Sequence, residues 1–62
     1  MPSDETRRLL KIFGVAVTTY EDLIQNRASS AEIQKAEAEA LSRLEEVRNH
    51  IDRLRSAIKT SN

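Results

Sequence analysis

The chain has 62 residues with ten basic and ten acidic side chains, and it contains no cysteine, which excludes disulfides and thiolate metal sites. Its formal net charge of zero argues against a general nucleic-acid binder, because such proteins normally carry a basic excess. A single glycine, a single proline and 32% charged residues are typical of long helices. We therefore expect one all-α domain that spans residues 1–62.

The sequence contains no candidate for a membrane-spanning segment. Its longest mostly apolar stretch, from Leu9 to Val17, is interrupted by Lys11 and is far shorter than the ~20 residues that a spanning helix needs. The first residues show no basic region followed by a signal-peptide pattern. The sequence therefore predicts a cytoplasmic protein without a membrane partner.

A first helix is expected from about residue 4 to residue 26. Ser3 can act as its N-cap, and Asp4 and Glu5 follow in the first turn, where carboxylates complement the helix dipole. Apolar residues then recur at helical spacing on a face about 160° wide. These residues are Leu9, Leu10, Ile12, Phe13, Ala16, Val17, Tyr20, Leu23 and Ile24.

A strand is the alternative for residues 12–20, which are rich in β-branched and aromatic side chains. Gly14 also disfavours a helix there by about 1 kcal/mol relative to alanine. However, the chain offers no second strand to pair with this one, and an unpaired strand leaves its backbone groups unsatisfied. The helix is the preferred interpretation.

A short break is expected at about residues 27–29. Asn26 suits the C-terminal end of the first helix because asparagine tolerates the left-handed backbone conformation. Ser29 and Glu32 form a capping box at the start of a second helix, which is expected from about residue 30 to residue 59. So short a connection makes the two helices antiparallel neighbours in a helical hairpin.

The second helix carries a narrower apolar stripe, about 80° wide, with Leu44 at one edge. Its residues follow a coiled-coil a/d pattern that is broken once, where Glu37 takes an a position. Ala36 and Ala40 are small enough to let the helices approach closely near the turn. The stripe consists of Ile33, Ala40, Leu44, Val47, Ile51, Leu54 and Ile58.

The different widths of the two apolar faces predict a homodimer. A narrow stripe suits one neighbour, whereas the wide face of the first helix can contact both the second helix and another molecule. A domain this small also buries only about 60% of the surface of its unfolded chain, so a second copy would help to complete the core. We expect an antiparallel four-helix bundle. Its expected interface residues are Leu10, Phe13, Val17, Tyr20 and Ile24.

The charges of the expected hairpin are polarised along its length. Residues 1–13 and 47–62 form the open end, with seven basic and three acidic side chains, and residues 14–46 carry three basic and seven acidic ones. The open end therefore has a net charge of +4 and the half that contains the turn has −4. A head-to-tail dimer alternates these signs. The charges expected to orient it are Glu37, Glu45, Arg48 and Arg55.

The basic open end permits a second hypothesis, an anion or RNA site made by Arg7, Arg8, Lys11, Arg48 and Arg55. In length and architecture the chain is similar to small dimeric helical hairpins of the Rop type, which bind RNA pairs on a face of the bundle. The similarity does not extend to matched RNA-contacting residues.

A third hypothesis is a metal-binding bundle that uses Glu46 and His50, which lie one helical turn apart. The commoner role for a helical histidine with acidic neighbours is a solvated surface group, and this is what we expect for His50. No nucleophile with an adjacent base is evident, so we expect no enzyme activity and no cofactor.

The leading prediction is a small interaction or accessory protein. It would act as a homodimeric bundle or as a helical subunit on a larger protein partner.

Overall fold

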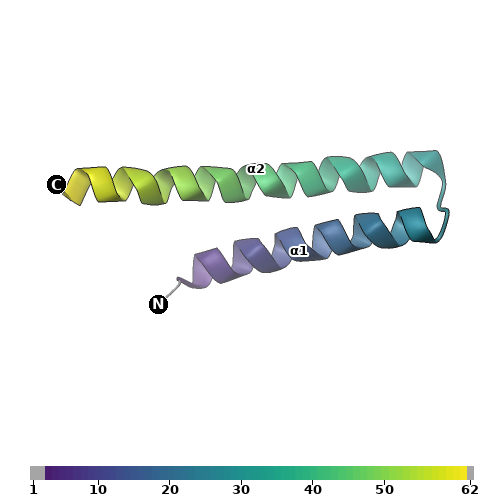
Figure 1. The fold of residues 1–62 in the computed structure, drawn as a ribbon, viewed down its shortest axis with the longest axis horizontal. Coiled ribbons are helices and arrows are strands. Elements are labelled where there is room, and N and C mark those ends of the chain that lie inside the picture. The colour runs from purple at the N-terminus through teal and green to yellow at the C-terminus, as the bar shows by residue number, and fades with distance from the viewer. Residues whose placement is uncertain (1–2, 62) are drawn as a thin grey trace.

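A computed structural model describes the backbone of residues 3–61 and the side chains of residues 3–58. Residues 1, 2 and 62 of the expected domain lie outside the described residues. Two helices, α1 (Asp4–Gln25) and α2 (Ser30–Ser61), run antiparallel and pack against each other (Figure 1). The prediction of an all-helical hairpin is confirmed.

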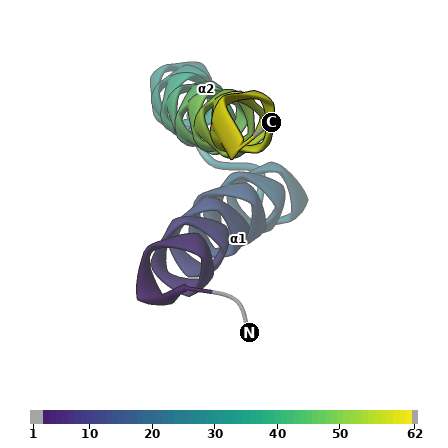
Figure 2. The same ribbon diagram turned by 90° about the vertical axis from the view of Figure 1, so that its left-hand side faces the viewer.

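The hairpin is a single elongated layer of two helices that measures 51 × 19 × 12 Å. Viewed from the end, the helices lie one above the other and are inclined to each other (Figure 2). Over the part of the chain that the structure describes, neither helix has the length and hydropathy needed to cross a membrane.

The start of α1 is capped as its sequence predicts. The backbone of Ser3 is extended, and its Oγ accepts a hydrogen bond of 3.1 Å from the Thr6 amide. Asp4 and Glu5 occupy the first turn. The helix continues through residues 12–20, so the strand alternative is wrong there. Within this segment, Thr18 Oγ1 donates a hydrogen bond of 2.8 Å to the Gly14 carbonyl one helical turn earlier.

The end of α1 differs from the prediction by one residue. Asn26 caps the helix with φ of −88°, and Arg27 takes the left-handed conformation with φ of 55°. The Ala28 amide donates to the Leu23 carbonyl at 2.9 Å, and the Arg27 amide donates to the Ile24 carbonyl at 3.1 Å. These two bonds define a Schellman motif, which requires a left-handed residue directly after the C-cap. The expectation of a left-handed Asn26 was therefore wrong.

The capping box at the start of α2 is confirmed. Ser29 Oγ accepts a hydrogen bond of 3.2 Å from the Glu32 amide, and the Glu32 carboxylate accepts bonds from the Ser29 amide and hydroxyl. Two adjoining caps thus close the turn. They explain why so few residues are sufficient to reverse the chain.

The contact between the helices is built around small side chains. Ala16 of α1 and both Ala36 and Ala40 of α2 are buried, as is Leu9 near the open end. Alanine lets helix axes approach closely because its side chain takes little room between them. The expected role of Ala36 and Ala40 is consistent with this burial.

The contact face of α2 is rotated by about 30° from the centre of the predicted stripe. Ile33, Ala40 and Val47 of that stripe do lie on the buried side, as expected. Leu44 itself is 46% exposed, and Ile51, Leu54 and Ile58 are also exposed. Leu44 and Ile51 are exposed because the helices pack on the alanine side, whereas Leu54 and Ile58 lie beyond the start of α1. The buried or half-buried residues that contact or face α1 are Ile33, Ala36, Ala40, Arg43, Val47 and His50.

The helices also differ in length, since α1 has 22 residues and α2 has 32. Contacts between Glu5 or Thr6 and His50 or Arg53 mark where α1 begins alongside α2. The last turns of α2 therefore extend beyond the start of α1 (Figure 1). Leu54 and Ile58 lie in this extension and have no residue of α1 opposite them.

Candidate interaction face

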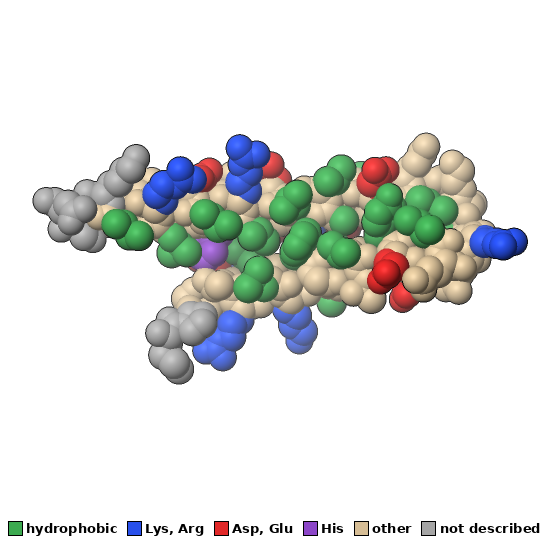
Figure 3. All heavy atoms as spheres, in the orientation of Figure 1, with side chains coloured by type: hydrophobic (Ala, Val, Ile, Leu, Met, Phe, Trp, Pro, Cys, Tyr) green, Lys and Arg blue, Asp and Glu red, His purple; other side chains and the backbone are tan. Residues whose placement is uncertain are grey.

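One side of the hairpin carries a continuous apolar face that the chain itself leaves uncovered. Figure 3 shows hydrophobic side chains gathered along both helices on this side. Helical positions assign six exposed large side chains to the face, three from each helix, and Leu54 and Ile58 adjoin it in the extension of α2. The six are Leu10, Val17, Ile24, Leu41, Leu44 and Ile51.

The residues predicted as a dimer interface lie on or beside this apolar face. Leu10, Val17 and Ile24 are exposed, whereas Phe13 and Tyr20 are half-buried between the face and the contact with α2. The prediction omitted the contribution of α2, because its stripe was assigned to the contact inside the hairpin. The missed signal was the length of α2, since Leu54 and Ile58 lie too far along the chain to reach α1.

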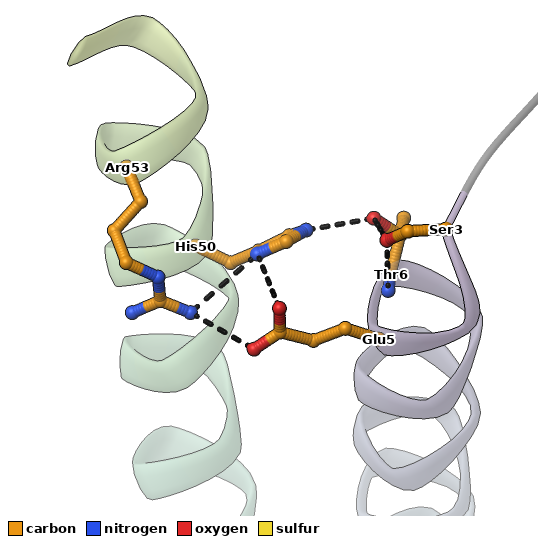
Figure 4. Close-up of polar contacts among 5 residues, drawn as sticks. All are labelled: Ser3, Glu5, Thr6, His50 and Arg53. Atoms are coloured by element: carbon orange, nitrogen blue, oxygen red, sulfur yellow. Dashed lines mark hydrogen bonds and ion pairs between the residues drawn. The ribbon is translucent and has the colours of Figure 1, made fainter. Parts of the chain in front are cut away.

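Polar side chains close the open end of the hairpin (Figure 4). His50 reaches from α2 to α1, where its Nε2 lies 2.7 Å from Thr6 Oγ1. Arg53 Nη2 lies 3.3 Å from Glu5 Oε2, and His50 Nδ1 lies 3.9 Å from Glu5 Oε1. We call Ser3, Glu5, Thr6, His50 and Arg53 the polar latch. Sequence analysis missed it because its members come from both ends of the chain.

His50 is only 6% exposed, so the expectation of a solvated surface histidine was wrong. The rotated contact face of α2 turns this ring towards α1. Arg53 Nη2 lies 3.5 Å from Nδ1, the ring nitrogen that also lies 3.9 Å from Glu5 Oε1. Nε2 forms a hydrogen bond with Thr6 Oγ1, and the Thr6 and Ser3 hydroxyl oxygens form a further hydrogen bond at 3.0 Å.

The candidate metal ligands Glu46 and His50 have other partners in the structure. Arg43 Nη1 donates to Glu46 Oε2 at 3.0 Å, and His50 contacts Thr6 as described. Among the described residues, no group of three or more histidine, cysteine, aspartate or glutamate side chains could hold a metal ion. The metal hypothesis remains a prediction without a supporting observation.

The four charges predicted to orient a dimer are all exposed on α2. Arg55 forms an ion pair of 2.7 Å with Asp52 on its own helix. Glu37, Arg48 and Arg55 share the side of α2 that carries Leu44 and Ile51, whereas Glu45 lies at its margin. They are therefore placed to contact whatever covers the apolar face.

The five residues of the proposed anion or RNA site lie on separate sides of the hairpin. Arg7, Arg8 and Lys11 occupy the outer and rear sides of α1, and Arg7 lies 3.9 Å from Asp4. Arg48 and Arg55 border the apolar face on α2. Figure 3 shows Lys and Arg side chains on opposite long edges with hydrophobic side chains between them. These five residues do not form one basic patch.

The opposite side of the hairpin has a shallow hollow of about 350 Å³. Ala16 and Ala36 are among the residues that line it, and Arg43 reaches across its rim to Glu39 at 2.8 Å. Val15 borders this hollow and is exposed on the side away from Leu10 and Leu44. The polar side chains that line it are Lys11, Thr19, Glu39 and Arg43.

Comparisons with family models, with curated proteins and with solved structures found no match. The candidate function therefore rests on the apolar face and on the charges around it.

Proposed function

We propose that this protein is a non-enzymatic interaction protein that pairs with a second copy of itself into an antiparallel four-helix bundle. The observation that supports this proposal is the apolar face, which extends over both helices and is not covered by any of the described side chains, those of residues 3–58. A hairpin has only one layer, and a layer that is apolar on an open side is stabilised by packing against another.

The surface area of the hairpin agrees with a missing layer. A compact monomer of 7.0 kDa exposes about 4,000 Å², whereas this chain exposes 5122 Å². The difference, about 1,100 Å², is similar to the ~800 Å² that each partner buries in a stable protein interface. Its radius of gyration of 15.0 Å also exceeds the ~11 Å expected for a compact domain of this length.

A second copy is favoured over another protein by the distribution of charge. The apolar face is bordered by both signs, with Glu37 towards the turn and with Arg48 and Arg55 towards the open end. A surface of this kind is complementary to itself when one copy is reversed. A two-fold axis then brings each acidic region close to a basic one.

Sedimentation equilibrium tests the proposal. We expect the unmodified protein at micromolar concentrations to have twice the 7.0 kDa mass of one chain. Leu44→Glu should shift it to a monomer, because the variant places a charge in the centre of the apolar face. Leu44 is exposed within the hairpin, so this substitution leaves the contact between the helices intact.

Val15→Glu is the matched control, because Val15 is similarly exposed, at 59%, but lies on the opposite side of the hairpin. This variant should remain a dimer. A folded wild-type monomer would contradict the proposal and would favour a different protein as the partner. Equal disruption by both substitutions would show that the apolar face is not the interface.

A further inference from the structure

The side of α2 that contacts α1 is one heptad seam, and the exposed side of α2 contains a second one. Its residues alternate at spacings of four and three and lie about 90° around the helix from the seam that faces α1. A rotation of this size is what separates two neighbours in a square bundle of four helices. We call it the outer seam, and it consists of Glu37, Leu41, Leu44, Arg48, Ile51 and Arg55.

The order of residues in the outer seam is complementary to its own reverse. When two copies run antiparallel and are centred level with Glu46, Glu37 lies opposite Arg55 of the partner subunit. In the same register Leu41 lies opposite Ile51 of the partner subunit. Each pair occurs twice because of the two-fold symmetry. The centre of the seam contains Leu44 and Arg48. The long aliphatic stem of Arg48 can pack on apolar surface while its guanidinium group stays in water.

We propose, on the basis of the dimer proposed above, that α2 pairs with α2 of a second copy in this register. The outer seam would then determine both the orientation and the alignment of the two copies. Its apolar residues supply contact area, and Glu37 and Arg55 select the antiparallel orientation and the alignment. Charges in such seams set partner and register more than overall affinity.

The position of α1 provides an independent observation in favour of this register. The contact between Thr6 and His50 places Leu10 level with Glu46, so Leu10 falls on the proposed two-fold axis. Leu54 then lies level with Val17 of the partner subunit. Ile58 lies level with the segment between Tyr20 and Ile24 of the partner subunit. The apolar residues in the extension of α2 are thereby covered.

A register centred on the middle of α1 does not give these matches. It brings Glu37 level with Glu45 of the partner subunit, which places two acidic residues together. It also leaves Leu54 level with the turn of the partner and Ile58 beyond that turn, where no helix of the partner covers them. The alignment centred on Glu46 is therefore preferred by both the charges and the apolar contacts.

Disulfide trapping distinguishes the two registers, because the natural chain has no cysteine. In the proposed register, Leu10→Cys brings two cysteines to the two-fold axis, within the ~7 Å between Cα atoms that a disulfide allows. The matched variant Val17→Cys places its cysteines about 21 Å apart along the helices. After mild oxidation, we expect Leu10→Cys to run as a covalent dimer on a non-reducing gel. We expect Val17→Cys to run as a monomer on the same gel.

Trapping by Val17→Cys, or failure of Leu10→Cys to trap in a protein that sediments as a dimer, would overturn the register alone. A wild-type protein that sediments as a monomer would instead overturn the dimer on which the register depends. The two failures are therefore distinguishable.

Charge reversal supplies a second readout of the same register. Glu37→Arg or Arg55→Glu alone should weaken dimerisation by about tenfold in Kd, because each creates two like-charged contacts. The double variant should restore the wild-type Kd, and these differences should shrink at high salt. Asp22→Arg, on a side of α1 away from the face, should have no such effect. Absence of restoration in the double variant would count against the pairing of Glu37 with Arg55.

Discussion

Arg27 holds a left-handed backbone conformation in the turn, with φ of 55°. This conformation costs a residue with a Cβ atom about 1–2 kcal/mol, whereas glycine adopts it freely. The Schellman hydrogen bonds of Arg27 and Ala28 require the conformation, so the cost is present in every folded molecule.

We therefore expect Arg27→Gly to raise the free energy of unfolding by about 1 kcal/mol. The measurement is urea denaturation at a fixed protein concentration. Arg27→Ala is the control, since alanine removes the same charge but keeps the Cβ atom. A similar gain in both variants would assign the effect to charge instead of backbone strain.

His50 depends on Thr6 for a hydrogen bond in a position that water reaches poorly. Thr6→Val keeps the shape of the side chain but removes the hydroxyl that forms a hydrogen bond with Nε2. We expect it to destabilise the protein by about 1–3 kcal/mol, the usual cost of leaving a buried polar group unsatisfied.

The same substitution should have almost no effect in a His50→Leu background, because the group that needs a partner is then absent. Urea denaturation of the two single variants and the double variant measures this coupling. Equal effects of Thr6→Val in both backgrounds would mean that the hydrogen bond does not contribute to stability.

At the scale of the helices, the ends were predictable from local sequence and the direction of contact was not. Ser3, and Ser29 with Glu32, are capping residues whose partners lie within three positions, so the sequence alone identifies them. Which side of α2 faces α1 depends on how closely two helices can approach. Hydrophobic periodicity correctly placed Ile33, Ala40 and Val47 on the contact side, but it also placed Leu44 there, which is 46% exposed.

Gly14 tests how much of the surface of α1 is free. It lies within the helix, and apart from its two chain neighbours and the adjacent helix backbone, a Cβ atom added to it would have no atom within 4 Å. Gly14→Ala should therefore raise the free energy of unfolding by about 1 kcal/mol, the difference in helix propensity.

The dimer should be unaffected by Gly14→Ala, since Gly14 lies at the margin of the apolar face. Circular dichroism during urea denaturation gives the stability, and sedimentation equilibrium gives the mass. A more helical but monomeric variant would show that a partner helix approaches the backbone at Gly14.

At the scale of the whole molecule, sequence analysis predicted an all-helical antiparallel hairpin with one short turn, and the structure confirms it. The apolar face was only partly predictable. The residues of α1 were identified, but those of α2 were assigned to the wrong neighbour. A helical wheel shows that α2 has two apolar sides. It does not show which of these sides packs against α1. The polar latch was unpredictable for a related reason, since its members meet only after the register of the hairpin is known.

The two ends of the hairpin are closed by different kinds of bond. The helices should therefore separate first at the end that carries the polar latch. Backbone hydrogen bonds between residues at most five apart close the turn, whereas the bond from Thr6 to His50 joins residues 44 positions apart. Closing the longer loop costs about 2 kcal/mol more in chain entropy. In a single chain, the contacts close to the turn should therefore form first, and those towards the open end should follow. Amide protons close to the turn should be the last to exchange with solvent, and those beside the polar latch should be among the first.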